Sequence, residues 1–526
     1  MNRAWLAALA FPAMTGSIAA QALAAPSFPV ACFHQPGRDA PPARDHVGAD
    51  DRFAARAQSR ARAMELERRA IAAFNEGELA QAEALLREQL ALQPGHFVVT
   101  YNLACVRTAA GDHDDGMRLL VQAIEEGFDD LRTMDRDPSL APLRARGEYR
   151  EIRAGWSDIL DARRDANVAS VLDFFSGDYR VHRDDRLRLV YVTAVRPSSA
   201  DAAREEISRL GEWACREIFP GLLDPPESAH DPWVVVVLPT PDDFGRWIAS
   251  RHGASGGAGL SSIGGEYDHD MKILVARDLG SSLRHEFFHV LHWRSCLRLG
   301  QRHAIWVQEG LGTLVEDYDA GPAPDGGIIL RHSWRTNIVK RLERAGRLAG
   351  LSDLCSASPD EFMSLRVLAS YARARSAFLY LAHHGKIRDW YERYTADFEK
   401  DRTGRIAWEK TFGTPMATID RDYRAWVRSI EMVPEEIGPG MASLGVEVES
   451  GEADGLIITR VVDPRRGGDG RLRQGDVLTD IDGRPTRDIA ELVRVLSGYR
   501  PGDRVTVGLR RGSRVRTETV TLIARS

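Results

Sequence analysis

The hydrophobic pattern changes twice along the chain, and this change constrains the fold more than any other feature. Apolar residues recur at helical spacing over residues 61–165, and strand-like and helical runs then alternate over residues 168–435. From residue 440 onward, short β-branched runs alternate with turn residues. A chain of 526 residues is too long for one hydrophobic core, because domains usually hold about 100 to 200 residues. The sequence therefore predicts a multidomain protein with an α-helical, an α+β and a β-rich domain in that order.

Composition and charge exclude several classes of protein. Hydrophobic residues make up 43% and charged residues 28% of the chain, which argues against a mostly disordered or membrane-embedded protein. The formal net charge of -6 provides no global basic field for binding phosphates. We therefore expect no nucleic-acid partner.

The N-terminus has the pattern of a secretory signal peptide. Arg3 precedes an uncharged, Ala-rich run that ends in small residues, and Pro12 makes this run a poor membrane span. We expect residues 1–25 to be cleaved, residues 26–60 to be a linker, and the mature chain to be periplasmic or secreted without a membrane span. Five cysteines without CxxC spacing allow at most two disulfide bridges in an oxidising compartment, and their pairing stays open.

The helical segment contains a repeat. Gly77 and Gly111 are thirty-four residues apart, and the small residues Ala82 and Gly116 keep the same offset. This pattern resembles the tetratricopeptide repeat, in which paired helices cross at the small residue. The resemblance implies TPR-like helical repeats over residues 61–165 that contact protein partners. The alternative is a generic helical spacer.

The last segment resembles a PDZ domain of the bacterial type. Leu444-Gly445-Val446 resembles the loop whose backbone amides hold a peptide carboxylate, and Gln474-Gly475-Asp476 resembles the turn before a central strand. The resemblance implies a PDZ domain over residues 440–526 in which Leu444, Gly445 and Val446 contact a peptide. The polar stretch DPRRGGDGRL departs from the usual pattern and leaves the peptide preference open.

The stretch HEFFH carries the candidate chemistry. A strand at residues 271–276 leads into it, and Ser281 is expected to cap its helix. Because His285 and His289 are four residues apart, both imidazoles leave one face of a helix and can bind one cation. Glu286 beside them can accept a proton from a water that the metal has made more acidic. The alternative is a structural pair of histidines on a half-exposed helix.

A second apolar-periodic helix supplies another candidate ligand. Nineteen residues separate Glu309 from His289, and Glu309 stands in the sequence Trp306-Val307-Gln308-Glu309-Gly310. This arrangement resembles the gluzincin metallopeptidases, in particular the peptidase-MA-like domains, and also the glycyl aminopeptidases, which carry a C-terminal PDZ domain. The resemblance implies a zincin-type domain over residues 168–435. Its implied Zn²⁺ ligands are His285, His289 and Glu309, with Glu286 as the general base and acid.

Other side chains compete for roles at this site. His292 extends the motif, but the metzincin pattern requires Gly there, so we expect His292 to be a bystander. The resemblance suggests that a Tyr on a later helix stabilises the oxyanion, and Tyr371 is the best placed, with ordinary core packing as its alternative. His383 and His384 are its rivals. The strand at residues 271–276 either pairs with substrate at a sheet edge or lies inside the sheet.

The sequence thus predicts an exported zinc-dependent metallopeptidase that hydrolyses peptide bonds, with TPR-like and PDZ modules that recruit protein substrates or partners. Removal of residues 440–526 is expected to leave hydrolysis of short peptides intact, because a PDZ groove binds far from the metal. The substrate and the choice between endopeptidase and aminopeptidase stay open. The alternative is a periplasmic scaffold with an inactive metallopeptidase-like domain, and the intact Glu286 counts against it.

Overall fold

The chain divides into two compact units in the computed structural model. Unit 1 comprises residues 1–30, 36–173 and 268–273, and unit 2 comprises residues 31–35, 174–267 and 274–526. The structure describes residues 30–33, 50–175, 177–223, 231–252, 263–269, 271–321, 327–363, 366–462 and 471–525. The predicted signal peptide lies outside the described residues. Within these ranges, no helix is long and apolar enough to cross a membrane.

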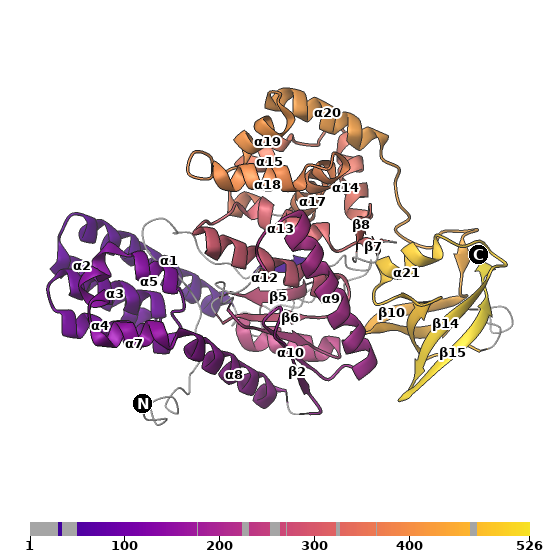
Figure 1. Cartoon of the computed structure of the whole chain (residues 1–526). Helices are drawn as coiled ribbons and strands as arrows, with labels where there is room; N and C mark the ends of the chain where they lie inside the picture. Colours follow the sequence, from indigo (N-terminus) through magenta and orange to yellow (C-terminus); the bar gives the residue numbers. More distant parts are fainter. Residues whose placement is uncertain are drawn as a thin grey trace. The chain divides into compact units, whose positions relative to one another are not determined.

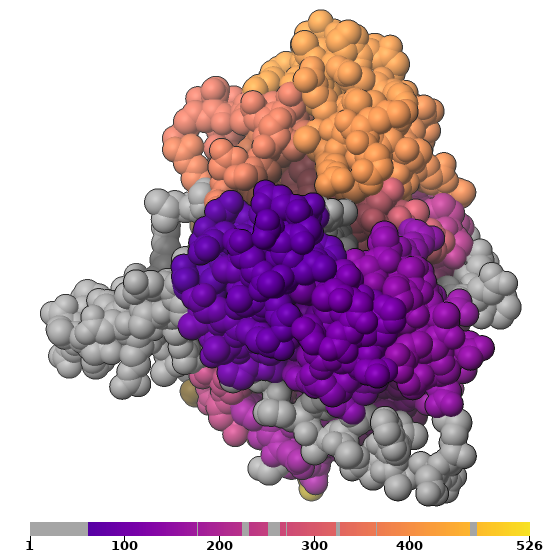
Figure 2. Space-filling view, turned by 90° about the vertical axis from the view of Figure 1, so that its left-hand side faces the viewer, coloured from indigo at the N-terminus to yellow at the C-terminus, as the bar shows by residue number. Residues whose placement is uncertain are grey.

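Unit 1 is built from helices, whose packed surface is coloured indigo to purple in Figure 2. They are α1 (Asp50–Asn75), α2 (Leu79–Leu92), α3 (Phe97–Ala109), α4 (His113–Glu126), α5 (Leu131–Arg136), α6 (Ala141–Arg144), α7 (Gly147–Ala154) and α8 (Trp156–Phe174). Gly77 and Gly111 take φ angles of 80° and 88° in the turns after α1 and α3, a conformation that favours glycine. Ala82 is fully buried, and a Cβ at Gly116 would collide with Thr108. Helices α3 and α4 therefore approach each other closely at the small residue Gly116.

The first part of unit 2 contains a mixed sheet with the described strand order β1-β5-β6-β4-β3-β2. The strands are β1 (Val30–Phe33), β2 (Arg180–Asp184), β3 (Leu189–Thr193), β4 (Trp233–Val237), β5 (Ile263–Asp268) and β6 (Ile273–Ala276). β3 and β4 are buried, β-branched and parallel, and α9 (Pro197–Glu217) connects them. The strand predicted at residues 271–276 is confirmed as β6, and the strand-like runs expected after residue 168 include β3 and β4. The polar β2 and the Gly-containing β5 lack such a run and were not predicted.

Strand β6 leads into helix α12 (Ser281–Leu299), which carries the HEFFH stretch. β6 lies between β5 and β4, so the interior alternative for residues 271–276 is confirmed and the edge alternative is wrong. The prediction that Ser281 caps α12 is also wrong, because Gly280 is the N-cap residue. The Asp278 carboxylate accepts hydrogen bonds from the backbone N–H groups of Gly280 and Ser282 at 2.8 and 3.1 Å. Asp278 thereby pairs with backbone N–H groups at the start of α12 that have no partner within the helix.

A helical layer follows α12, coloured red to orange in Figure 1. Its members are α13 (Ile305–Leu314), α14 (Trp334–Arg344), α15 (Leu351–Ser356), α16 (Pro359–Phe362), α17 (Val367–His383), α18 (Ile387–Ala396), α19 (Arg405–Phe412) and α20 (Met416–Ser429), and a short hairpin pairs β7 (Tyr318–Ala320) with β8 (Ile328–Leu330). α13 packs closely on α17, because a Cβ at Gly310 would lie 2.6 Å from the Phe378 ring. The Trp306 ring stacks on Phe378 from the same side, with 5.6 Å between centroids. This packing fixes α13, which carries Glu309.

The C-terminal part of unit 2 is β-rich, as predicted. Its main sheet has the order β10 (Val446–Glu452), β11 (Gly455–Val461), β12 (Val477–Ile481), β14 (Arg504–Arg511), β15 (Arg514–Thr521), with β13 (Arg484–Pro485) paired to β12. β9 (Ala442–Ser443) pairs with β16 (Ile523–Ala524), and α21 (Ile489–Leu496) packs on the same core. Gly475 has a φ of 83° just before β12, which lies inside the sheet. The predicted turn before a central strand is confirmed.

Helix α21 and the residues before it contact the beginning of α12 through a buried group of four charges, named here the four-charge cluster. It consists of Glu206 on α9, Arg284 on α12, Arg487, and Glu491 on α21. Arg284 Nη1 lies 3.0 Å from Glu206 Oε1 and 3.2 Å from Glu491 Oε1. Arg487 pairs with the same two carboxylates at 2.6 and 2.8 Å. The β-rich part therefore buries charges of the part that holds HEFFH, which argues against the expectation that hydrolysis of short peptides stays intact when residues 440–526 are removed.

Candidate metal centre

The side chains of His285, His289 and Glu309 form a buried cluster whose ligand atoms all lie within 4.8 Å of one another. His285 Nε2 lies 2.9 Å from His289 Nε2, and Glu309 Oε2 lies 3.4 and 3.7 Å from these two nitrogens. Ligand atoms of one tetrahedral zinc ion lie about 3.3 Å apart, since each is about 2 Å from the metal. The sequence spacing therefore brings together three ligands at distances that fit a metal ion.

The Glu309 carboxylate supplies an independent test of this fit. Its side chain is fully buried, and neither oxygen accepts a hydrogen bond from any described residue. Burying an ionised carboxylate without a partner costs several kcal/mol or more, so such groups are normally paired or bound to a metal. The two imidazole nitrogens that face Glu309 are atoms of a type that binds metal ions. A cation between the three side chains would complete this donor set.

A carboxylate behind His285 fixes the proton on that ring. His285 Nδ1 lies 3.0 Å from Glu316 Oε1, and Arg335 donates to both Glu316 oxygens at 2.6 and 2.9 Å. Burial alone would raise the pKa of Glu316, but the Arg335 charge and the His285 hydrogen bond hold that pKa well below its usual range. An ionised Glu316 accepts the Nδ1 proton, and the His285 Nε2 lone pair then faces the cluster. The sequence analysis missed Glu316 and Arg335, because no fixed spacing links them to HEFFH.

His289 is held as a neutral ring. Burial lowers its pKa well below the usual range, and the neighbouring His285 and His292 lower it further. The ring stacks on Tyr267 of β5, with 4.6 Å between centroids and 25° between planes. A neutral imidazole keeps the lone pair that a metal requires.

Glu286 lies against strand β5 at a glycine. The side chain is fully buried, and a Cβ at Gly265 would come within 2.5 Å of Glu286 Cγ and 2.8 Å of Oε1. Gly265 brings the β5 backbone up to the carboxylate without a side chain of its own. The absence of a Cβ at residue 265 therefore sets the position of Glu286.

A second glycine makes room for His285. A Cβ at Gly312 on α13 would lie 2.8 Å from His285 Nε2 and 2.9 Å from Cε1. Both distances are shorter than side-chain carbons tolerate. Gly265 and Gly312 are thus features of the site that a search for ligand residues overlooks.

The remaining sequence candidates differ in their positions. The buried Tyr371 ring stacks on His285 with 6.4 Å between centroids, so α17 brings Tyr371 beside the cluster. His292 does not join the three ligands and instead lies 2.7 Å from His303. The His383 ring contacts Trp426, and the His384 ring contacts Phe412. Among the described residues, neither His383 nor His384 belongs to a metal-type cluster.

The PDZ loop has a defined backbone. Leu444 is buried, and Gly445 takes a φ of 70°. The Gly445 N–H donates to Ser443 Oγ at 3.0 Å, and its carbonyl accepts from the Val462 N–H at 2.9 Å. Val446 begins β10, which ends the described sheet on that side, so a peptide strand has an edge to pair with.

The fold and the cluster define a multidomain chain with a buried His-His-Glu metal-type site and a β-rich C-terminal domain. Residues 442–522 match the family model described as the PDZ domain. No curated protein matches the chain. A solved aminopeptidase N family protein from Idiomarina loihiensis is 13% identical, with 66% of this chain and 68% of that chain covered and a TM-score of 0.20. Likeness at that score supports no argument about fold or activity, so the proposals below rest on the residues of this chain.

Proposed function

We propose that this protein is a zinc-dependent metallopeptidase of the gluzincin type that hydrolyses peptide bonds. The buried Glu309 carboxylate, which has no described hydrogen-bond donor and faces the Nε2 atoms of His285 and His289, carries the proposal. Zinc favours this combination of two imidazoles and one carboxylate when its fourth position is left for water or substrate. The neutral His289 and the Glu316-oriented His285 are already in the protonation states that zinc requires.

The residues of the site have separate roles in this proposal. His285, His289 and Glu309 would hold the zinc, which when bound would supply Lewis acidity that lowers the pKa of water and polarises a carbonyl. Glu286 takes up a proton at its carboxylate and transfers it to the leaving amine. Tyr371 donates a hydrogen bond to the oxygen that gains charge in the transition state.

The flanking domains serve recruitment. The PDZ domain binds a peptide or a protein, since β10 offers a strand edge next to the Leu444-Gly445-Val446 loop. The helices of unit 1 repeat at the spacing that resembles tetratricopeptide repeats, and we assign them to partner binding on that basis. The Ala-rich N-terminal run supports export to the periplasm or beyond.

Two substitutions separate catalysis from metal binding. Glu286→Gln should keep about one zinc per chain while hydrolysis of a denatured-protein mixture falls by about 100-fold or more, because Glu286 is not a ligand. Glu309→Ala should lose zinc as well as activity, because one of three ligands is gone. His383→Ala, on the exposed end of α17, is the control and should change neither quantity.

The same measurements distinguish an enzyme from a scaffold. Zinc content is determined by elemental analysis of the purified full chain, and hydrolysis by the release of new amino termini. A wild-type chain that binds no zinc, or Glu309→Ala that retains it, contradicts the gluzincin assignment. In that case the inactive scaffold becomes the better description.

A further inference from the structure

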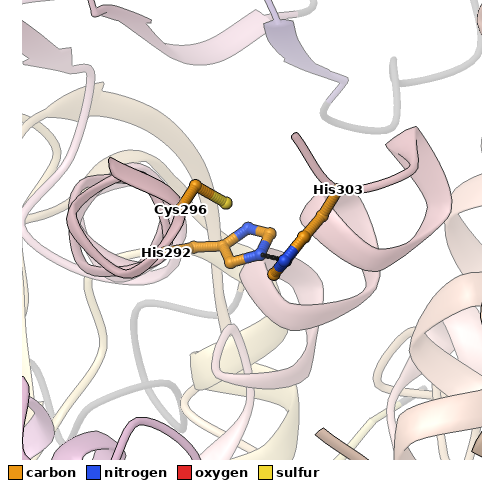
Figure 3. A group of neighbouring side chains, drawn as sticks. All are labelled: His292, Cys296 and His303. Atoms are coloured by element: carbon orange, nitrogen blue, oxygen red, sulfur yellow. Dashed lines mark hydrogen bonds between the residues drawn. The ribbon is translucent and has the colours of Figure 1, made fainter. Parts of the chain in front are cut away.

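A second cluster of metal-type ligands lies on the same two segments as the first. His292 and Cys296 are four residues apart on α12, and His303 lies just before α13. Figure 3 shows His292 and Cys296 leaving the helix toward the His303 ring. The ligand atoms lie within 4.8 Å of one another, and all three residues are buried. CxxC spacing does not reveal this cluster, because its one cysteine lies near two histidines, one on the same helix and one in the loop before α13.

The hydrogen bonds around His303 fix its lone pair. The Gln301 amide nitrogen donates to the Thr395 carbonyl at 2.7 Å, and this carbonyl can only accept. The Gln301 amide oxygen therefore faces His303 Nε2 at 3.1 Å, so Nε2 carries the proton. His303 Nδ1 consequently presents a lone pair toward His292 Nε2, 2.7 Å away.

Cys296 supplies the third donor. The backbone N–H of His303 points at its sulfur, and Arg302 places a positive charge nearby. A backbone N–H that points at a cysteine sulfur stabilises the thiolate once a metal replaces the proton. Binding is then an exchange in which the metal ion forms a bond to Sγ and the thiol proton leaves to solvent. No electron is transferred.

The surroundings decide which ion fits. Aromatic rings enclose the cluster: Phe219 stacks on His292 at 6.0 Å between centroids, and Tyr394 and Phe398 lie 4.8 and 5.5 Å from His303. Two neutral imidazoles and one thiolate carry a single negative charge, which a monovalent ion cancels. A divalent ion would leave a net positive charge buried among aromatic rings and near Arg302, at a high desolvation cost.

We propose that His292, Cys296 and His303 form a binding site for copper(I), separate from the His-His-Glu centre. Copper(I) is a soft ion that accepts thiolate and imidazole ligands. The two sites would thus bind different metals along α12. The carboxylate of Glu309 favours zinc at His285 and His289, and the thiolate of Cys296 favours copper(I) at His292. This proposal does not depend on peptidase activity.

Copper binding is tested on the purified full chain after zinc loading, with copper(I) and the chromophoric chelator bicinchoninate under anaerobic conditions. Wild type should retain about one copper(I) per chain against the chelator. Cys296→Ser and His303→Gln should each weaken retention by about 100-fold, the upper range for disturbed metal sites. Cys355→Ser, which removes another buried thiol on α15, is the matched control and should retain copper as wild type does.

A measurement on wild type keeps the test independent of how well the variants fold. Copper K-edge X-ray absorption should show one sulfur and two imidazole neighbours. A copper environment without sulfur overturns the proposal, as does a wild-type chain that retains no copper(I). Zinc that occupies Cys296 in preference to copper(I) overturns it too. Binding that survives in Cys296→Ser has the same consequence.

Discussion

Gly312→Ala should weaken zinc binding without removing a ligand. The added Cβ would lie 2.8 Å from His285 Nε2, whereas ordinary contacts begin at 3.4 Å. The ring or α13 must therefore shift by about 0.6 Å, the difference between these two distances, which exceeds the tolerance of about 0.2 Å for metal–ligand bonds. Disturbing the support of a metal ligand typically costs about 10- to 100-fold in affinity, or about 1.4 to 2.7 kcal/mol.

The assay for this variant is competition for zinc with a fluorescent chelator of known affinity, together with a thermal melt of the metal-free chain. The control is Gly245→Ala on α10 (Pro241–His252), where an added Cβ meets nothing within 4 Å. The control should bind zinc as wild type does and melt at the same temperature or slightly higher. Unchanged zinc affinity in Gly312→Ala would show that His285 is not held against α13 as described, and the reasoning from the close approach would fail.

Three further predictions concern Gly265 and Tyr371 at the candidate metal centre and Glu206 in the four-charge cluster. Gly265→Ala should retain zinc but lose hydrolysis, because the methyl group displaces Glu286; zinc content and peptide turnover are measured together, and full activity would contradict the contact. Tyr371→Phe should lower kcat with little change in KM, whereas the buried control Tyr423→Phe should leave kcat unchanged. Burial alone would raise the pKa of Glu206, but the charges of Arg487 and Arg284 lower this pKa to about 2. The ionised Glu206 therefore stabilises the fold fully above about pH 4.5, and this stabilisation is lost as the pH falls through about 2. Thermal melts should show Glu206→Gln less stable than wild type near pH 6, with the gap closing toward pH 2; a constant gap would contradict the linkage.

That His285 and His289 lie together could be predicted from sequence, because helical geometry fixes their relation locally. The two histidines share a face of α12 through their spacing, whereas the position of Glu309 on the next helix was implied only by the resemblance to gluzincin metallopeptidases. Glu316 could not be predicted, because its contact with His285 depends on how the chain turns after α13. The start of α12 was predicted at the wrong residue, since the Asp278 side chain, rather than Ser281, satisfies the exposed N–H groups.

Strand β5 shows a different limit of the sequence. Its residues IGGEYD contain two glycines and little apolar surface, so neither composition nor alternation indicates a strand. One of these glycines, Gly265, allows the backbone to approach Glu286. The glycine that makes room for Glu286 thus also makes strand β5 difficult to recognise from sequence.

The four-charge cluster also limits how this protein can change over generations. Arg284 and Glu206 stand far from Arg487 and Glu491 in the sequence, yet each arginine is shared by both carboxylates. Loss of one member leaves a buried charge unbalanced, at a cost of about 3 to 5 kcal/mol. Substitutions at these four positions should therefore be inherited together. A PDZ domain borrowed from another gene would not fit here unless it brought the matching arginine and glutamate with it.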